Sequence, residues 1–506
     1  MVRPKDFPGT FWIANTMEIF ERMAWYGFFA VSSLYITGAV SDGGLGFSDE
    51  DRGILQGVVT FFLYLFPVAS GALADRYGFK KMLFWSFLVL TPAYFFLGQF
   101  NSFYSFFLAF MLVAIGAGMF KPVIIGTVSK TTNDKTSSMG FGIFYMMVNI
   151  GGFVGPIIAG ILRAWDWNYV FMASSGWIII NIILVSIFYR EPTSESKSEN
   201  PRTFKKVLED MVEVLGNGRF FLLVFVLLIL LVLGSKLTAI GYISWGGIMI
   251  LSILWLALNF LYYMFIKKIQ GRDKMPWYLQ PVKLADWKFG LYLLLMSGFW
   301  TCFNQIFYTL PLHIRDFVDT SDIMAASVSF FETIGLSSFV PVFKSAMVTP
   351  GQINPEYIIN IDAGAIIIFQ VVISVIVGRM QPFTTIFWGV VITIVSFVIL
   401  VLGTSGWIVV AGIVVFSFGE MMASPKSKEY TGKIAPPNKV ALYMGYFYWC
   451  VALGNLFGGL LSGQMYATFA RDMQRPDLMW LFFALLALIT AVAIFFYDRV
   501  VIKKKS

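Results

Sequence analysis

Residues 383–402 read FTTIFWGVVITIVSFVILVL, a stretch that contains no Asp, Glu, Lys or Arg. A helix needs about 20 mostly apolar residues to cross the hydrocarbon core of a bilayer, and this stretch meets that need. The rest of the chain has the same character, because 58% of its 506 residues are hydrophobic and only 13% are charged. Soluble domains carry about 25% charged residues. The sequence therefore predicts a helical integral membrane protein.

Similar apolar runs recur on both sides of this stretch and predict fourteen membrane-spanning helices. They are expected near residues 10–38, 52–74, 81–100, 103–129, 137–162, 168–189, 219–235, 240–266, 289–314, 356–378, 383–402, 406–425, 440–466 and 477–500. The stretch 322–348 is apolar but contains Glu332, Pro341 and Lys344, and we interpret it as an external loop with a surface or re-entrant helix.

The pattern of six, two and six spans predicts three parts. They are an N-terminal six-helix bundle at 1–190, cytoplasmic linkers with an accessory hairpin at 191–288, and a C-terminal six-helix bundle at 289–506. Two halves of this kind are typical of secondary transporters, whose binding site lies between the halves near the middle of the membrane.

The distribution of basic residues predicts the orientation. The net charge of +8 would suggest a nucleic-acid partner in a soluble protein, but here Lys and Arg concentrate in alternate loops, as cytoplasmic loops do. We therefore expect a multi-pass protein of the cell membrane with both termini in the cytoplasm, and no nucleic-acid partner. Residues 1–10 are short and polar, so no cleavable signal peptide is expected. The loops assigned to the outside hold only Arg52, Arg163, Lys236, Arg315, Lys344, Arg471 and Arg475.

Ionisable residues inside the spans are the candidate functional residues. One Arg, Lys or Asp at a helix centre costs about 2.5–3.5 kcal/mol on lenient insertion scales, so such residues persist where they pair or face a wet cavity. The first span holds Glu18, Glu21 and Arg22, which share one helical face. Two acids around one Arg leave one carboxylate that can take up and release a proton. A cluster that only stabilises the bundle is the alternative.

Further charges lie in both predicted bundles. Lys121 follows Gly116-Ala117-Gly118 and precedes Pro122, deep in the fourth span, where it needs an anionic partner. In the second bundle, Glu420 lies in mid-span before a Ser-Pro break, and Asp362 lies nearer a span end, where an exposed cap is the alternative. Asp75 and Arg76 lie in a tight turn after the second span and are candidates for gating, or for topology alone.

Little in the sequence indicates catalysis. Cys302 and Cys450 are far apart in apolar stretches, and His313 is the only histidine. No HExxH or GxSxG constellation lies in the spans, so neither an enzyme, a metal site nor a bound cofactor is expected.

Two motifs resemble those of the proton-dependent oligopeptide transporters of the major facilitator superfamily. Glu18-x-x-Glu21-Arg22-x-x-x-Tyr26-Gly27 is similar to that family's ExxER(F/Y)xYYG signature, with Met23 and Trp25 at positions that are usually Phe and Tyr. The run from Phe144 to Gly151, FYMMVNIG, is similar to its FYxxINxG signature. The additional helical pair is typical of prokaryotic members. The resemblance covers nearly the whole chain.

The resemblance implies roles for the charged residues. Glu18, Glu21 and Arg22 would couple proton and substrate, and Arg22 with Lys121 would hold the carboxylate of a peptide. Glu420 and Asn149 would hold its amino group. Lys121 and Glu420 would also pair across the halves in the substrate-free state. The same resemblance places Tyr26, Phe29, Tyr64, Trp300 and Asn304 along the substrate cavity.

Two departures from the family pattern stand out. The spans of the two bundles are numbered here without the accessory pair, so that 289–314 is span seven and 356–378 is span eight. The family usually has a second Arg where this chain has Phe29, and an Asp or Glu in span seven where this chain has Asn304. In typical members these two groups form a salt bridge, and losing only one would strand a buried charge at a cost of about 3–5 kcal/mol. The family's usual Asn in span eight is Asp362 here. We hypothesise that the acid of the second half has moved to Asp362, which alone or with Glu420 would supply proton coupling or bind the amino group. The alternative is that coupling runs only through Glu18 and Glu21.

The sequence thus predicts an all-α transporter of the major facilitator superfamily fold. It would be a symporter that imports di- or tripeptides with protons by alternating access, and we expect it to be a monomer. Three alternatives remain: a related carrier with another substrate or altered proton coupling, a channel, and a nutrient receptor that does not transport.

Overall fold

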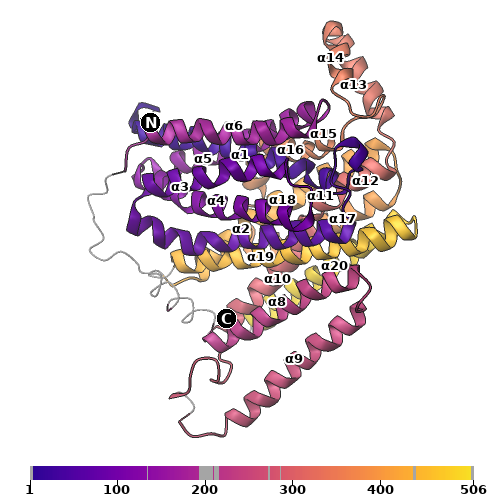
Figure 1. Ribbon diagram of the computed structural model, residues 1–506. Helices are drawn as coiled ribbons and strands as arrows, with labels where there is room; N and C mark the ends of the chain where they lie inside the picture. Colours follow the sequence, from indigo (N-terminus) through magenta and orange to yellow (C-terminus); the bar gives the residue numbers. More distant parts are fainter. Residues whose placement is uncertain are drawn as a thin grey trace.

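The computed structural model describes residues 4–133, 135–192, 209, 216–271, 274–284, 286–436 and 440–502. Every regular element in these ranges is a helix, and one isolated β-bridge joins Asp319 to Ser405 (Figure 1). The predicted all-helical fold is therefore confirmed. The polar linker expected between Tyr189 and Asn217 lies for the most part outside the described residues, as does the basic C-terminus at 503–506.

The first six long helices pack together and form what we call the N-half. In it, α1 packs against α5 and α6, and α4 packs against α2 and α3. Short 3₁₀ turns flank α1 (η1, Pro4–Asp6; η2, Val40–Asp42), and a π turn (η3, Leu184–Phe188) ends α6. The helices are α1 (Gly9–Thr37), α2 (Asp49–Tyr77), α3 (Phe79–Leu97), α4 (Phe103–Lys130), α5 (Ser137–Arg163) and α6 (Trp167–Ile183).

The C-half is built from residues 287–502, and its first spans are interrupted. Residues 287–317 form three consecutive segments that meet at Asn304 and Thr309. Pro311 has no backbone N–H, so the carbonyl of Phe307 lacks its helical partner at the second break. The elements are α10 (Trp287–Phe303), α11 (Gln305–Tyr308), α12 (Leu310–Phe317), α15 (Pro355–Ile359), α16 (Ile361–Val377), α17 (Pro382–Val401), α18 (Gly406–Ile434), α19 (Val440–Met465), η6 (Tyr466–Asp472), α20 (Pro476–Phe496) and η7 (Tyr497–Ile502).

The long axis of the bundle has two distinct ends. Figure 1 shows the N- and C-terminal ends of the chain at the same end of the bundle, which we call the terminal end. The turn at Gly78, between α2 and α3, also lies there. The opposite, distal end holds the segment 38–48 and the connection from α12 to α15.

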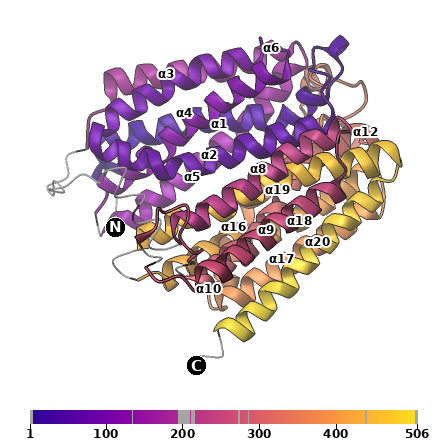
Figure 2. The same ribbon diagram turned by 60° about the horizontal axis from the view of Figure 1, so that its bottom comes forward.

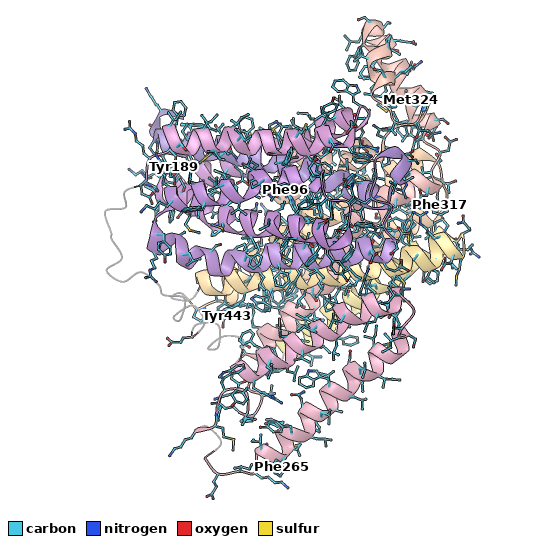
Figure 3. All side chains as sticks on the ribbon, in the orientation of Figure 1. Phe96, Tyr189, Phe265, Phe317, Met324 and Tyr443 are labelled. Atoms are coloured by element: carbon cyan, nitrogen blue, oxygen red, sulfur yellow. The ribbon has the colours of Figure 1, made fainter. Side chains whose placement is uncertain are left out.

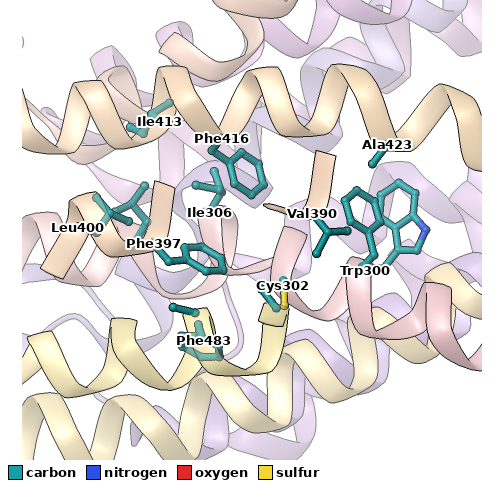
Figure 4. Packing of buried hydrophobic residues seen from close by; sticks show 14 of the residues in the cluster. Trp300, Cys302, Ile306, Val390, Phe397, Leu400, Ile413, Phe416, Ala423 and Phe483 are labelled. Carbon is teal, nitrogen blue, oxygen red and sulfur yellow. The ribbon is translucent and has the colours of Figure 1, made fainter. Parts of the chain in front are cut away.

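Each half has its own apolar core, and a third cluster joins them. Figure 4 shows Phe397 and Phe416 packed around Ile306 in the C-half, where Phe397 and Phe416 lie 6.4 Å apart between ring centroids. The two halves meet most closely along α2 and α19. A Cβ on Gly53 would lie 2.4 Å from the carbonyl oxygen of Gly459, so this contact requires glycine. The joining cluster consists of Ile54, Val58, Phe61, Ala452, Leu456 and Leu460.

A helical hairpin, α8 (Gly218–Ala239) and α9 (Trp245–Ile266), lies outside the two halves (Figure 2). Lys236 of α8 forms an ion pair with Asp51 at the start of α2. Near its other end, the ring of Phe221 lies 6.0 Å from that of Trp449 on α19. The inner helix of the hairpin therefore contacts both halves.

Residues 322–348 form the short helices α13 (Ser321–Thr333) and α14 (Val340–Ser345), linked by the 3₁₀ turn η5 (Ser337–Phe339). They project sideways from the distal end, across the direction of the long helices (Figure 1). The structure therefore places this apolar stretch outside the bundle.

The count of fourteen spans is not confirmed. Within the described residues, ten helices are long and apolar enough to cross a membrane by length and composition. The spans expected near 10–38, 52–74, 81–100 and 289–314 are not among them. The first carries Glu18, Glu21 and Arg22 in its middle, and the last is broken into three segments. The proposed boundaries at 190 and 288 likewise stay a prediction.

Candidate functional site

Two carboxylates and two cations gather inside the N-half. Glu18 and Glu21 are fully buried on α1, and Arg22 is 5% exposed. The Arg22 Nε donates a hydrogen bond to Oε2 of Glu21 at 2.6 Å and lies 3.4 Å from Oε1 of Glu18. Nζ of Lys121, on α4, lies 3.6 Å from the same oxygen of Glu18. The sequence-predicted cluster is thus assembled, and its formal charges balance.

The position of Lys121 depends on an irregularity in α4. Pro122 cannot donate a helical hydrogen bond, which frees the carbonyl of Gly118. The hydroxyl of Ser70, on α2, donates to that carbonyl at 2.5 Å. A Cβ on Gly118 would lie 2.6 Å from Cβ of Phe66, so only glycine permits this approach. The Gly-Pro pattern therefore brings α2 against the turn that carries Lys121.

Glycines of α5 allow that helix to lie directly against Arg22. A Cβ on Gly151 would lie 2.5 Å from the Cβ of Arg22, and one on Gly155 would lie 2.7 Å from the carbonyl oxygen of Met23. Asn149, two residues before Gly151, donates from its side-chain amide to the carbonyl of Tyr145 at 2.9 Å. The FYMMVNIG motif therefore packs against the charged motif of α1.

The C-half contributes two acids and no base within ion-pair distance among the described side chains. Asp362 is 5% exposed on α16, and its Oδ1 accepts a hydrogen bond from the Ser417 hydroxyl on α18 at 2.6 Å. Burial rules out the alternative of an exposed helix cap. Glu420 lies about one helical turn after Ser417, is half-buried, and its Oε2 has no hydrogen-bond partner in the described structure.

Tyrosines lie between the acidic and basic groups of the two halves. Tyr26 interacts electrostatically with Arg22 on its own helix and with Glu420 of the C-half. Tyr145 of α5 also interacts electrostatically with Glu420 and Asp362. Tyr145 was not among the predicted site residues, although it stands inside the quoted motif. The ring of Tyr64 stacks on that of Tyr448 across the halves at 6.4 Å.

The expected pair between Lys121 and Glu420 is not formed. Lys121 contacts Glu18 instead, and Glu420 makes no ion pair among the described residues. The two residues are therefore held apart in this conformation, and their pairing in another one stays a prediction.

The two departures from the family pattern both lie near the broken seventh span. Phe29 is buried, with its ring 5.9 Å from that of Phe307 and 5.7 Å from that of Tyr308. Asn304 ends α10, and its amide donates to the carbonyl of Trp300 at 2.9 Å. Trp300 itself is 8% exposed and packs in the C-half core. Aromatic contact thus takes the place of a charged pair here.

An ion pair that the sequence did not reveal closes the distal end. Nε and Nη2 of Arg163, on α5, donate to the two carboxylate oxygens of Glu356, on α15, at 2.6 and 2.9 Å. Glu356 is fully buried. Such two-pronged pairs fix geometry as well as energy.

A second set of contacts at the distal end binds the main chain of the broken seventh span. The Ser33 hydroxyl lies 3.3 Å and 3.1 Å from the carbonyl oxygens of Phe307 and Tyr308. Arg52 is fully buried and donates from Nη1 to the carbonyl of Tyr308 at 2.9 Å and from Nη2 to the hydroxyl of Ser462 at 3.0 Å. These residues were missed, and Pro311 was the signal that could have indicated a free carbonyl.

The terminal end is arranged differently. The side chain of Asp75 lies outside the described part of the structure, and Arg76 is exposed with its guanidinium over the ring of Tyr77. Glu191 accepts from the backbone N–H groups of Phe79 and Lys80 at 2.6 and 2.9 Å and so caps α3. Among the described residues, every hydrogen bond and ion pair between the halves lies in the distal part of the bundle.

The described residues contain no group of three or more His, Cys, Asp or Glu that could hold a metal ion. Cys302 and Cys450 are both free and buried.

Comparisons with known proteins show which family the chain is similar to. The model of the Major Facilitator Superfamily matches residues 16–240 and 324–506. The peptide transporter YePEPT of Yersinia enterocolitica is 23% identical over 483 residues, which covers 89% of this chain and 86% of the relative. The uncharacterized transporter YclF of Bacillus subtilis is 24% identical over 460 residues, covering 88% and 86%.

The fold is also similar to solved structures. The crystal structure of an auto-inhibited POT family peptide transporter aligns with a TM-score of 0.70 and 17% identity, over 97% of each chain. At this identity the likeness concerns the fold alone. Because the family model matches most of the sequence and the fold agrees with it, this chain belongs to the major facilitator superfamily.

Proposed function

We propose that the protein is a proton-coupled symporter that imports di- and tripeptides by alternating access. Membership of a superfamily of transporters and a relative named as a peptide transporter support peptide transport. The signature residues Glu18, Glu21 and Arg22 support membership of the proton-dependent oligopeptide transporters within that superfamily.

The observation that carries the proposal is the division of charge between the halves. A peptide is a zwitterion, with a carboxylate at one end and an ammonium group at the other. Arg22 and Lys121 of the N-half supply cations for the carboxylate, while Glu420 of the C-half, with an oxygen left unpartnered, suits the ammonium group. Tyr26 lies within electrostatic range of both sides.

Protonation of Glu18 would couple the proton to the substrate. When a proton neutralises Glu18, the attraction that holds Lys121 is lost, and Lys121 becomes available for a substrate carboxylate. Release of the proton restores the pair and favours release of the substrate. Glu21 keeps Arg22 in place throughout, because it accepts the shorter hydrogen bond.

The observed closure of the distal end fits a carrier that opens toward its terminal end. If both termini lie in the cytoplasm, as the basic loops indicate, this conformation faces inward. Opening the distal end would then require separating Arg163 from Glu356 and Arg52 from the carbonyl of Tyr308.

We also propose that Asp362 has taken over the role of the acid that typical family members carry at the position of Asn304. Asp362 is buried, accepts a hydrogen bond from Ser417, and lies on the same side of the C-half as Glu420. In liposomes, Asp362→Asn should abolish uptake driven by a pH gradient while exchange of labelled peptide continues. Unchanged driven uptake would leave Glu18 and Glu21 as the sole coupling acids.

Uptake by the purified protein in liposomes tests the main proposal. Labelled dialanine should accumulate when the outside is acidified and should stop accumulating when a proton carrier collapses the gradient. Counterflow, in which unlabelled peptide inside drives labelled peptide inward, should persist without a gradient. Binding without counterflow would indicate a receptor, and flux that unlabelled peptide never accelerates would indicate a channel.

The main alternative is a related carrier with a different substrate or altered coupling. Phe29 supports it, because an apolar ring near the carboxylate site tolerates bulkier or less acidic ligands than an arginine would. A thermal-shift screen with peptides, nitrate and small conjugates separates the two. Stabilisation by a non-peptide alone, followed by its uptake, would replace the peptide assignment.

A further inference from the structure

The helical hairpin formed by α13 and α14 is not part of the transport site, yet it carries large apolar side chains on its outside. Between Ser321 and Met347 the sequence has only three charged residues, Asp322, Glu332 and Lys344. Water-facing hairpins normally carry many more. Five large apolar side chains near the tip are 42–59% exposed: Phe330, Ile334, Leu336, Phe339 and Val342.

The hairpin is itself packed, although these residues are exposed. The hairpin has its own core, in which the ring of Phe331 lies 5.2 Å from that of Phe339 and 5.1 Å from that of Phe343. Met324, at the base, is 6% exposed where the hairpin leaves the bundle (Figure 3). The hairpin is therefore folded on its inside and apolar on its outside.

The base of the hairpin is fixed at one level of the bundle. The N–H of Asp319 donates to the carbonyl of Thr404 at 2.9 Å, and the hydroxyl of Ser405 donates to Asp322 at 2.6 Å. Both contacts hold the hairpin to the turn between α17 and α18, directly before the exposed Trp407.

Four exposed aromatic residues lie at helix ends in the same distal part of the bundle as the base of the hairpin. Tyr104 at the start of α4, Trp165 after α5, Tyr242 between α8 and α9, and Trp407 at the start of α18 are all at least half exposed at the distal end. Exposed Trp and Tyr at helix ends mark the boundary between lipid and water. The hairpin therefore leaves the bundle at the membrane surface, and Figure 1 shows it running sideways rather than over the distal end.

We propose that α13 and α14 lie in the interfacial layer of the lipid bilayer and anchor the distal end of the protein to the membrane surface. The exposed apolar side chains continue the lipid-facing surface of the bundle, and the few charges are compatible with shallow insertion. Interfacial helices bury their apolar face about 5–10 Å into the boundary between headgroups and acyl chains. Because the hairpin points sideways, it does not form a lid over the distal end of the transport path.

Spin labels test the depth of the hairpin. Cys302 and Cys450 are first replaced by Ala, and single cysteines are then introduced by Ile334→Cys or Leu336→Cys. The protein is placed in nanodiscs that hold one copy each. Val371→Cys on α16, where the native residue is 73% exposed on an apolar face, reports lipid, and Val40→Cys, where it is 72% exposed in the distal segment, reports water.

We expect labels at 334 and 336 to be several-fold less accessible to a water-soluble nickel chelate than the label at 40, and more accessible to oxygen. Nickel accessibility equal to that at 40 would overturn the proposal. Protection that appears only in liposomes with many copies, together with spin–spin broadening, would instead identify a second copy as the occupant.

A second variant tests the cause of the insertion. Ile334→Glu combined with Leu336→Glu places two charges at the exposed tip without touching the Phe331 core. A label introduced by Val342→Cys should then become several-fold more accessible to the nickel chelate than in the parent. No change in accessibility would show that the apolar tip does not hold the hairpin in the lipid.

Discussion

The buried carboxylates of the two halves differ in their partners. In the N-half, Glu18 and Glu21 lie beside Arg22 and Lys121, so the cluster is electrically balanced without a ligand. In the C-half, Asp362 is held by a hydroxyl, and Glu420 keeps an unpartnered oxygen. The comparison teaches that the N-half can exchange internal ion-pair partners for a substrate. The acids of the C-half form no such pair among the described residues, and only Lys428 attracts Glu420 electrostatically, so Glu420 keeps an oxygen free for a substrate cation.

The largest effect on stability is expected from removing one charge of the balanced cluster in the N-half. Arg22→Met leaves Glu21 buried without its hydrogen-bond donor, and removing one member of a buried pair costs about 3–5 kcal/mol of folding stability. Thermal unfolding of the purified protein measures this loss. Dialanine uptake should also disappear.

The matched control removes the stranded acid as well. Combining Arg22→Met with Glu21→Gln should recover most of the stability but none of the transport, because the buried charge is gone while the cation for the substrate is still missing. Equal destabilisation of the single and double variants would mean that Glu21 and Arg22 do not act as a pair.

A smaller effect, on binding rather than stability, is expected in the C-half. Glu420→Gln removes the proposed partner of the substrate ammonium group, and a hydrogen bond to a charged group contributes about 1.5–3 kcal/mol. The affinity for dialanine, measured by competition for uptake, should fall by about tenfold to a hundredfold. The unfolding temperature should change little, since Glu420 forms no ion pair among the described residues and only loses its electrostatic attraction to Lys428.

N-acetylated dialanine provides the control for Glu420, because it has no ammonium group. Its affinity should be weak in the parent and nearly unchanged by Glu420→Gln. If the substitution weakens both peptides equally, Glu420 does not contact the amino end, and the proposed direction of the peptide in the site is wrong.

The smallest effect concerns the hydroxyl that holds Asp362. Ser417→Ala removes a buried hydrogen bond of 2.6 Å, and a typical loss is about 1 kcal/mol of stability. If Asp362 carries the coupling proton, the pH at which driven uptake is half-maximal should also move upward, because the carboxylate loses a donor that favours its charged form. A change in stability with an unmoved pH profile would assign Asp362 a structural role.

Much of the site could be predicted because charged residues stand out in an apolar sequence. The cost of burying charge identifies Glu18, Glu21, Arg22 and Lys121 as site residues. The helix period places the first three on one face of α1. The structure adds the partner of Lys121, which turns out to be Glu18 rather than Glu420. That choice depends on the conformation of the two halves, which a sequence does not contain.

Contacts between distant helices could not be predicted. Arg163 and Glu356 are separated by 193 positions, and Arg163 was interpreted only as a loop charge that helped to set orientation. Pro122 and Pro311 mark positions in the sequence that leave a carbonyl group without its helical partner, but they do not show that Ser70 and Ser33 are the donors. Local pattern identifies an unsatisfied group, whereas its partner depends on how the helices are placed.

The contacts of Arg52 and Ser33 have a consequence for how the protein tolerates change. Ser33 binds the backbone carbonyls of Phe307 and Tyr308, and Arg52 binds that of Tyr308. Every amino acid offers the same backbone carbonyl. The sequence at 307 can therefore vary without abolishing this seal, as long as Pro311 keeps the carbonyl of Phe307 available. Position 308 is more restricted, because the hydroxyl of the buried Tyr308 also lies 2.9 Å from that of Thr60 in the N-half. Side chains at position 307 can thus change while the protein retains the contacts that close its distal end.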